Sequence, residues 1–234
     1  MKACLAKGYD LIRKPAVFLP PLLAAAWYIA YSLRFIQDDA FIFLRYAENW
    51  ADGYGLVWAP GQSVQGFTNL LWTLWLSVPF RIGADPVPFA IWSGLLIYPL
   101  SLFLIYCQAC RLLGNRFYAL AVLILLASNY TFVSYASGGL GTQLQLALAL
   151  AAACLTFIWY DRAGWHSIAW TAGLSLAWGI SLLSRLDSAV FAAVFGLWAL
   201  YSVFRQGGGR SWISSRVTAL ILPGAVILAA YLAW

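Results

Sequence analysis

Charged residues are scarce in this sequence. Of its 234 residues only 9% are charged, whereas 63% are hydrophobic. An ordinary soluble domain is about 45–50% apolar and about 25% charged. A soluble core of this size could not bury so much apolar surface, so the composition excludes a soluble globular domain and indicates a multi-pass helical membrane protein. The net charge of +6 comes from short basic clusters between apolar runs, which is typical of membrane topology signals and not of nucleic-acid binding.

Residues that bind metals or carry redox chemistry are also few. The only histidine, His166, follows Trp165 at the start of an apolar run, where an interfacial position is expected. Cys107 and Cys110 form a CxxC pair at the end of an apolar run. No second pair of ligands lies nearby, so neither a zinc site nor a redox site is predicted. Acidic side chains can hold a divalent cation through their oxygens, but no spacing here specifies such a site.

The apolar runs predict an all-α polytopic fold with about seven transmembrane helices in a single membrane module over residues 1–234. The predicted spans are residues 15–33, 86–110, 117–136, 143–160, 164–184, 188–204 and 217–234. A further apolar run, residues 67–80, is short for a crossing and is predicted to lie in the membrane interface.

The distribution of charge predicts which loops face the cytoplasm. With seven spans, one side collects ten of the 14 basic residues and two of the eight acidic ones. These are Lys2, Lys7, Arg13, Lys14, Arg111, Arg116, Arg162, Arg205, Arg210 and Arg216, with Asp10 and Asp161. The other side holds Arg34, Arg45, Arg81, Arg185, Asp38, Asp39, Glu48, Asp52, Asp85 and Asp187. Since cytoplasmic loops carry the excess of Lys and Arg, the N-terminus is predicted to be cytoplasmic and the loop 34–85 to lie outside.

The loop 34–85 begins with the adjacent carboxylates Asp38 and Asp39. Residues 40–52 then predict an amphipathic helix at the interface, because Arg45, Glu48, Asn49 and Asp52 share one face. One interpretation is structural: Asp38 caps this helix and Asp39 occupies its first turn. The other is catalytic, with one of the two acting as a general base. His166 is predicted to face the cytoplasm, so a general base outside the cytoplasm must be the carboxylate of an Asp or Glu residue.

Arginine is the only basic residue type on the outer side, and its planar guanidinium suits a phosphate. Arg185 is the strongest candidate, because the segment Ser184-Arg185-Leu186-Asp187 lies between two apolar runs. A simple ion pair between Arg185 and Asp187 at the interface is the alternative, and the sequence leaves both open.

Three motifs of the first outer loop carry a family resemblance. They are Gln37-Asp-Asp-Ala-Phe-Ile-Phe-Leu-Arg-Tyr-Ala-Glu-Asn, then Gly53-x-Gly-Leu-Val, then Gly66-Phe-Thr-Asn-x-Leu-Trp. They resemble the first outer loop of GT-C class glycosyltransferases, above all the polyprenyl-phosphate-arabinose-dependent arabinofuranosyltransferases of bacterial cell envelopes. Residues 137–142 and 184–187 look like the short motifs of the next two outer loops. The resemblance covers the N-terminal membrane half of such an enzyme and lacks its outer C-terminal domain. Because the chain stops at Trp234 in an apolar run, a missing C-terminal half or a partner subunit is expected.

The resemblance implies inverting transfer of a sugar from a polyprenyl-phosphate carrier to a hydroxyl of a glycan or glycoprotein acceptor, outside the bacterial inner membrane. Asp38 or Asp39 would be the catalytic base. The candidate substrate-binding residues are Arg45, Gln65, Thr68, Asn69, Arg185 and Asp187. The sequence departs from the family at Gln65 and Gly141, where members carry Glu, and at Leu186, where they carry Pro.

Two alternatives stay open. One is a catalytically silent or truncated membrane subunit, which the departures at Gln65 and Gly141 favour. The other is a lipid or solute transporter, which the near absence of charge within the spans disfavours.

Overall fold

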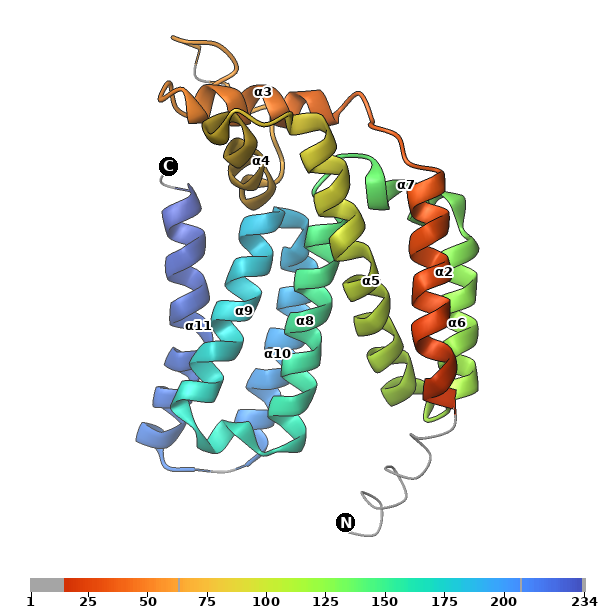
Figure 1. Cartoon of the computed structure of the whole chain (residues 1–234). Helices are drawn as coiled ribbons and strands as arrows, with labels where there is room; N and C mark the ends of the chain where they lie inside the picture. Colours follow the sequence, from red (N-terminus) through yellow and green to blue (C-terminus); the bar gives the residue numbers. More distant parts are fainter. Residues whose placement is uncertain (1–14, 63, 207, 233–234) are drawn as a thin grey trace. The chain divides into compact units, whose positions relative to one another are not determined.

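The computed structural model describes residues 15–62, 64–206 and 208–232, and every regular element among them is a helix. The basic cluster Lys2, Lys7, Arg13 and Lys14, together with Asp10 and Trp234, lies outside the described residues. The elements are η1 (Pro15–Phe18), α2 (Leu19–Ser32), α3 (Ala40–Ala51), α4 (Leu70–Ile82), α5 (Pro86–Leu113), α6 (Arg116–Ser128), α7 (Tyr130–Ser137), α8 (Thr142–Asp161), η2 (Gly164–His166), α9 (Ile168–Ser184), η3 (Leu186–Ser188), α10 (Ala189–Arg205) and α11 (Arg210–Leu232) (Figure 1).

Four described helical segments are long and apolar enough to cross a membrane: α5, α8, η3 with α10, and α11. The bent pair α6 and α7 would make a fifth if it is one span. The chain is therefore all-α with the helices of a multi-pass membrane protein, as the composition predicts. The predicted number of seven crossings stays a prediction, because α2 and α9, which lie in two of the predicted spans, have only 14 and 17 residues.

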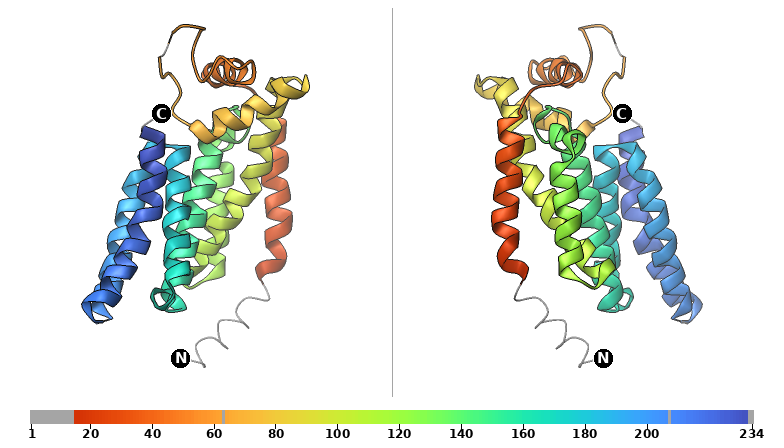
Figure 2. Two further views of the ribbon diagram at one scale, coloured as in Figure 1. Left: turned by 90° about the vertical axis from the view of Figure 1, so that its left-hand side faces the viewer. Right: turned by 90° about the vertical axis from the view of Figure 1, so that its right-hand side faces the viewer.

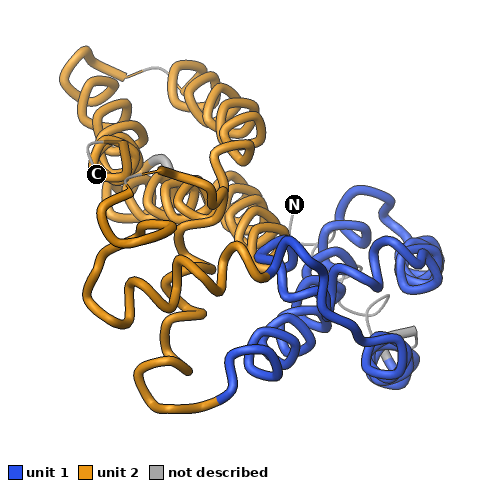
Figure 3. The backbone as a smooth tube through the Cα atoms, turned by 90° about the horizontal axis from the view of Figure 1, so that it is seen from above, with its two compact units in different colours: residues 1–40, 85–143 blue, residues 41–84, 144–234 orange. Residues whose placement is uncertain are grey.

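The chain divides into two compact units (Figure 3). Unit 1 comprises residues 1–40 and 85–143, and unit 2 comprises residues 41–84 and 144–234. The predicted single module stays a prediction, and each unit is described by itself below.

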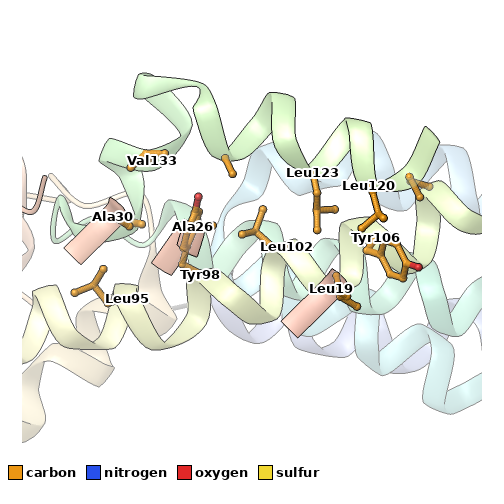
Figure 4. Packing of buried hydrophobic residues seen from close by; sticks show 14 residues of the cluster. Leu19, Ala26, Ala30, Leu95, Tyr98, Leu102, Tyr106, Leu120, Leu123 and Val133 are labelled. Atoms are coloured by element: carbon orange, nitrogen blue, oxygen red, sulfur yellow. The ribbon is translucent and has the colours of Figure 1, made fainter. Parts of the chain in front are cut away.

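Unit 1 is held together by apolar side chains from α2, α5, α6 and α7 that point toward one another (Figure 4). Its buried centre includes Leu95, Tyr98 and Leu102 of α5, Leu123 of α6 and Val133 of α7. The helices begin where a side chain accepts a hydrogen bond from a free backbone N–H: the Asp85 carboxylate caps α5 and the Asn115 amide caps α6. The helix α5 continues through Pro99.

The predicted span 117–136 is not one straight helix, which corrects the prediction. Helix α6 ends at Ser128, and α7 starts at Tyr130 after a bend of 69°. The cause is Asn129, whose backbone is extended and whose side-chain oxygen accepts a hydrogen bond from the backbone N–H of Phe132 at 3.0 Å. An Asn side chain that caps a new helix competes with continuation of the old one.

Unit 2 contains α8, α9, α10 and α11, which pack side by side with alternating direction (Figures 1 and 2). Its core includes Trp159 of α8, Leu174 and Trp178 of α9, and Ala199 and Val203 of α10. Only 6% of the most apolar stretch of α11 is buried, which fits a helix that contacts lipid. The helices α3 and α4 run across the direction of these four (Figures 1 and 2). That is the orientation expected of helices lying along a membrane surface.

The two ends of unit 2 differ in charge. Because successive helices alternate in direction, Arg162, Arg205 and Arg210 gather at the end opposite η3 (Figure 1). His166 lies at this basic end, where its backbone oxygen accepts a hydrogen bond from Nη2 of Arg216 at 2.9 Å. The prediction that this end faces the cytoplasm stays a prediction.

Candidate functional site

The carboxylates of Asp38 and Asp39 precede α3 and belong to unit 1. The helix begins at Ala40, after a turn closed by the Ala40 N–H and the Gln37 carbonyl at 3.0 Å, so Asp39 does not occupy its first turn. Both side chains are exposed, and neither makes a hydrogen bond or ion pair within the described part of the chain. They are accessible to a substrate proton.

The segment that carries these acids is fixed to the second predicted outer loop. The Gln37 N–H donates to the Gly138 carbonyl at 3.0 Å, and the Phe35 N–H donates to Oγ of Ser137 at 3.4 Å. Gly139 has φ of 75°, and a Cβ there would lie 2.8 Å from the Cβ of Ala40. The loop 137–142 thus meets the first loop through the Gly138 carbonyl and the Ser137 hydroxyl, and Gly139 permits the close approach.

In unit 2, the loop 53–66 is fastened onto α3. Asn49, predicted to lie on the polar face of this helix, is buried under the loop, where its Nδ2 donates to the carbonyls of Val57 and Trp58 at 2.7 and 2.9 Å. Nε of Arg45 also donates to the Trp58 carbonyl at 3.1 Å, and its Nη1 pairs with Glu48 at 2.8 Å. The guanidinium of Arg45 therefore stabilises the loop, and its predicted substrate contact stays a prediction.

Four of the predicted binding residues line one pocket of unit 2. The pocket measures about 320 Å³ and is formed by segments that lie more than a hundred residues apart in the chain. Its lining residues are Gln65, Phe67, Thr68, Arg185, Leu186, Asp187 and Tyr231. The short motifs of the first and third predicted outer loops are thus brought together as candidates for one ligand.

The charge of this pocket comes from Arg185 and Asp187. The guanidinium binds the carboxylate twice, with Nε to Oδ1 at 3.2 Å and Nη2 to Oδ2 at 3.0 Å. The Asp187 side chain is 56% exposed, and such ion pairs contribute about 0–1 kcal/mol to stability. Gln145 of α8 also donates from Nε2 to Oδ1 of Asp187 at 3.0 Å. The pair holds the guanidinium in the pocket, where a phosphate could replace the carboxylate as its partner.

Thr68 and Asn69 have different positions although they are adjacent. Thr68 lines the pocket, whereas Asn69 is only 1% exposed. The Oδ1 of Asn69 caps α4 by accepting from the Trp72 N–H at 3.0 Å, and its Nδ2 donates to Oγ of Ser184 at 3.2 Å. Asn69 therefore joins the start of α4 to the end of α9 and supports the pocket from behind.

Replacing Asn69 by Ala is expected to lower stability by about 2 kcal/mol, because a helix cap and a buried hydrogen bond are lost together. The melting temperature of the detergent-solubilised protein measures the effect. Asn69→Ser keeps an uncharged capping oxygen and loses the donor to Ser184, so it should fall between the wild type and Asn69→Ala. A melting temperature unchanged in Asn69→Ala would contradict the structural role.

An apolar pocket of about 360 Å³ shares Tyr231 with the polar one. It is lined by Trp50, Leu56, Leu70, Leu74, Leu183, Ile227, Ala230 and Tyr231. The hydroxyl of Tyr231 accepts a hydrogen bond from Nε2 of Gln65 at 3.1 Å. The sequence does not single out Tyr231 as a site residue, because nothing distinguishes one tyrosine near the end of an apolar run from the others.

Among the described residues, no group of three or more His, Cys, Asp and Glu side chains could hold a metal ion. A comparison of the chain with known protein families, with curated proteins and with solved structures finds no match.

Proposed function

We propose that this chain is a membrane glycosyltransferase of the GT-C type, or the N-terminal part of one. It transfers a sugar from a polyprenyl-phosphate carrier to an acceptor hydroxyl outside the cytoplasm, with inversion at the anomeric carbon. The observation that carries the proposal is the polar pocket with Arg185 and the apolar pocket that shares Tyr231 with it. Together they offer a guanidinium and an apolar site to one amphiphilic ligand.

The polar pocket suits the phosphate of such a carrier. Arg185 offers a fork of donors, and Gln65 and Thr68 add uncharged groups that can hydrogen-bond a sugar. As the carrier phosphate leaves, it gains negative charge, which a nearby guanidinium stabilises. The apolar pocket, with Leu74, Leu183 and Ile227 in its walls, suits the first isoprenoid units.

Asp38 or Asp39 supplies the base in this proposal. Asp187, the only carboxylate that lines the polar pocket, is bound to Arg185 and Gln145. Both of its carboxylate oxygens already accept hydrogen bonds from these side chains, so neither is well placed to accept the proton of an attacking hydroxyl. The unengaged carboxylates of Asp38 and Asp39 are better suited to that role.

The polar pocket contains no carboxylate other than the engaged Asp187, which favours one alternative: a membrane protein that binds a lipid phosphate without catalysing a reaction. Gln65 lines the polar pocket where the family carries Glu, and an amide cannot take a proton from a hydroxyl. A transporter is less favoured because the predicted spans hold almost no charge, although the bend between α6 and α7 is a feature that transporters also have.

Filling the apolar pocket tests the proposed donor. Leu183→Trp is expected to weaken binding of undecaprenyl phosphate by about tenfold, because the larger ring displaces several buried methylene groups of the ligand. Binding is measured by native mass spectrometry of the full chain in nanodiscs. Leu197→Trp makes the same change on an exposed face of α10 and should leave binding unchanged.

Turnover separates the enzyme from the silent binder. With polyprenyl-phosphate-arabinose and an oligosaccharide acceptor, the proposal expects formation of a glycosylated product. Binding without product would support the alternative, and equal binding by the wild type and Leu183→Trp would remove the apolar pocket as the lipid site.

A further inference from the structure

A third pocket lies where the loop 53–66 meets α3, and none of the residues predicted from the sequence lines it. It measures about 300 Å³. Its walls are formed by Ile42, Tyr46, Trp58, Gln62, Val64 and Gly66, all of which belong to unit 2. It shares no lining residue with the pocket that contains Arg185.

The walls combine a flat aromatic surface with neutral hydrogen-bonding groups. The Trp58 side chain is 45% exposed, and its ring centroid lies 6.0 Å from that of Tyr46 at a tilt of 56°. The exposed amide of Gln62 offers both donors and an acceptor. No charged side chain lines this pocket. An ionic ligand would find no counter-charge here.

Hydrogen bonds hold the Tyr46 and Trp58 sides of the pocket in place. The Tyr46 hydroxyl donates to the Val64 carbonyl at 2.6 Å and accepts from the Gly66 N–H at 2.8 Å. A Cβ at residue 66 would lie 2.9 Å from this hydroxyl, so glycine permits the contact. On the other side, Asn49 and Arg45 hold the Trp58 carbonyl. A preformed site pays little ordering entropy when it binds a ligand.

We infer that this pocket binds a neutral carbohydrate through the exposed ring of Trp58. A sugar ring has an apolar face of C–H groups, which packs on an aromatic ring, and a rim of hydroxyls, which an amide such as Gln62 can hydrogen-bond. Its role as the acceptor site rests on the proposed function, whereas binding of the sugar itself does not. The other candidate role for Trp58 is an anchor in the lipid headgroups, and the experiment separates the two.

The test measures binding of neutral tetrasaccharides of glucose, galactofuranose and arabinofuranose to the full chain in zwitterionic nanodiscs, by saturation-transfer difference NMR. No lipid-linked donor is present. At least one of the three is expected to bind, and Trp58→Ala should weaken that binding about tenfold or more through loss of the stacking surface. Trp58→Phe, which keeps a smaller ring, should lose less, and Gln62→Ala should also weaken binding.

Tyr54→Ala is the matched control, because Tyr54 is an exposed aromatic residue of the same loop that does not line the pocket. Its sugar binding should equal that of the wild type, and circular dichroism checks the helical content of every variant. If none of the tetrasaccharides binds, or if Trp58→Ala binds as well as the wild type, the site is overturned. A Trp58→Ala variant that reconstitutes poorly yet binds sugar normally would identify the ring as a lipid anchor.

The outcome is distinguishable from that of the proposed function. Sugar binding that depends on Trp58, without any sugar transfer, would support the carbohydrate site and contradict the proposed transferase activity. If Trp58→Ala transferred sugar with the wild-type rate and acceptor KM, the transferase activity would be supported and the carbohydrate site contradicted.

Discussion

Replacing Asp38 or Asp39 by Asn is expected to lower sugar transfer by about a hundredfold or more in at least one of the two variants, because an amide cannot accept the proton of the acceptor hydroxyl. Asn has nearly the same shape as Asp. Both side chains are exposed and without partners in the described part of the chain, so folding should be unaffected. The initial rate of product formation from a polyprenyl-phosphate sugar measures the effect, and the variant with the larger loss identifies the base.

The matched control is Asp52→Asn, which removes an exposed acid of the same predicted outer loop. Its rate should equal that of the wild type, and all three variants should melt at the same temperature. If both Asp38→Asn and Asp39→Asn transferred sugar at the wild-type rate, neither residue would be the general base. A loss of rate in Asp52→Asn of the same size would indicate a general effect of loop charge.

Arg185→Gln is expected to weaken binding of the polyprenyl-phosphate donor by about ten- to a hundredfold, since hydrogen bonds to charged groups contribute about 1.5–3 kcal/mol. Arg185→Lys keeps the charge but loses the planar fork that binds two oxygens, so it should recover only part of this loss. The Kd for the donor and the rate at saturating donor separate binding from stabilisation of the leaving phosphate.

Asp187→Asn provides the opposite change at the same place. The carboxylate that occupies the guanidinium is removed, so the donor should bind at least as tightly as it does to the wild type. A structural role for the ion pair makes a different prediction: Arg185→Gln and Asp187→Asn would lower the melting temperature equally, and neither would change the Kd of the donor.

The sequence predicts three of the long apolar helices well, since α5, α8 and α10 begin and end within three residues of the predicted spans, whereas α11 begins seven residues before the predicted span 217–234. The apolar run 117–136 misled the prediction because hydropathy averages over a window, whereas a single side chain, Asn129, can end one helix and begin the next. The signal was present as an Asn in the middle of the run.

The sequence indicates most of the polar residues of the pocket that contains Arg185, but not the packing that supports them. Arg185 and Asp187 stand out as charged groups between apolar runs, Gln65 and Thr68 are candidates through the family resemblance, and the structure brings all four together. Asn69 looks equivalent to Thr68 in sequence, and only the packing of α4 on α9 reveals that it is buried. Trp58 gave no signal, because 13 tryptophans occur in the chain and a loop position does not distinguish a binding surface from an interfacial anchor.

The contact of Gln37 with Gly138 has a consequence for the order of assembly. Unit 1 is discontinuous, so its first 40 residues emerge from the ribosome well before the loop to which they attach. During synthesis, the segment with Asp38 and Asp39 stays unanchored until α7 and the turn after it have been made. Contacts between residues so distant in the chain form late, because closing a long loop has to precede them. Shortened chains that stop before residue 138 should therefore insert their first helices and still leave these two acids unfixed.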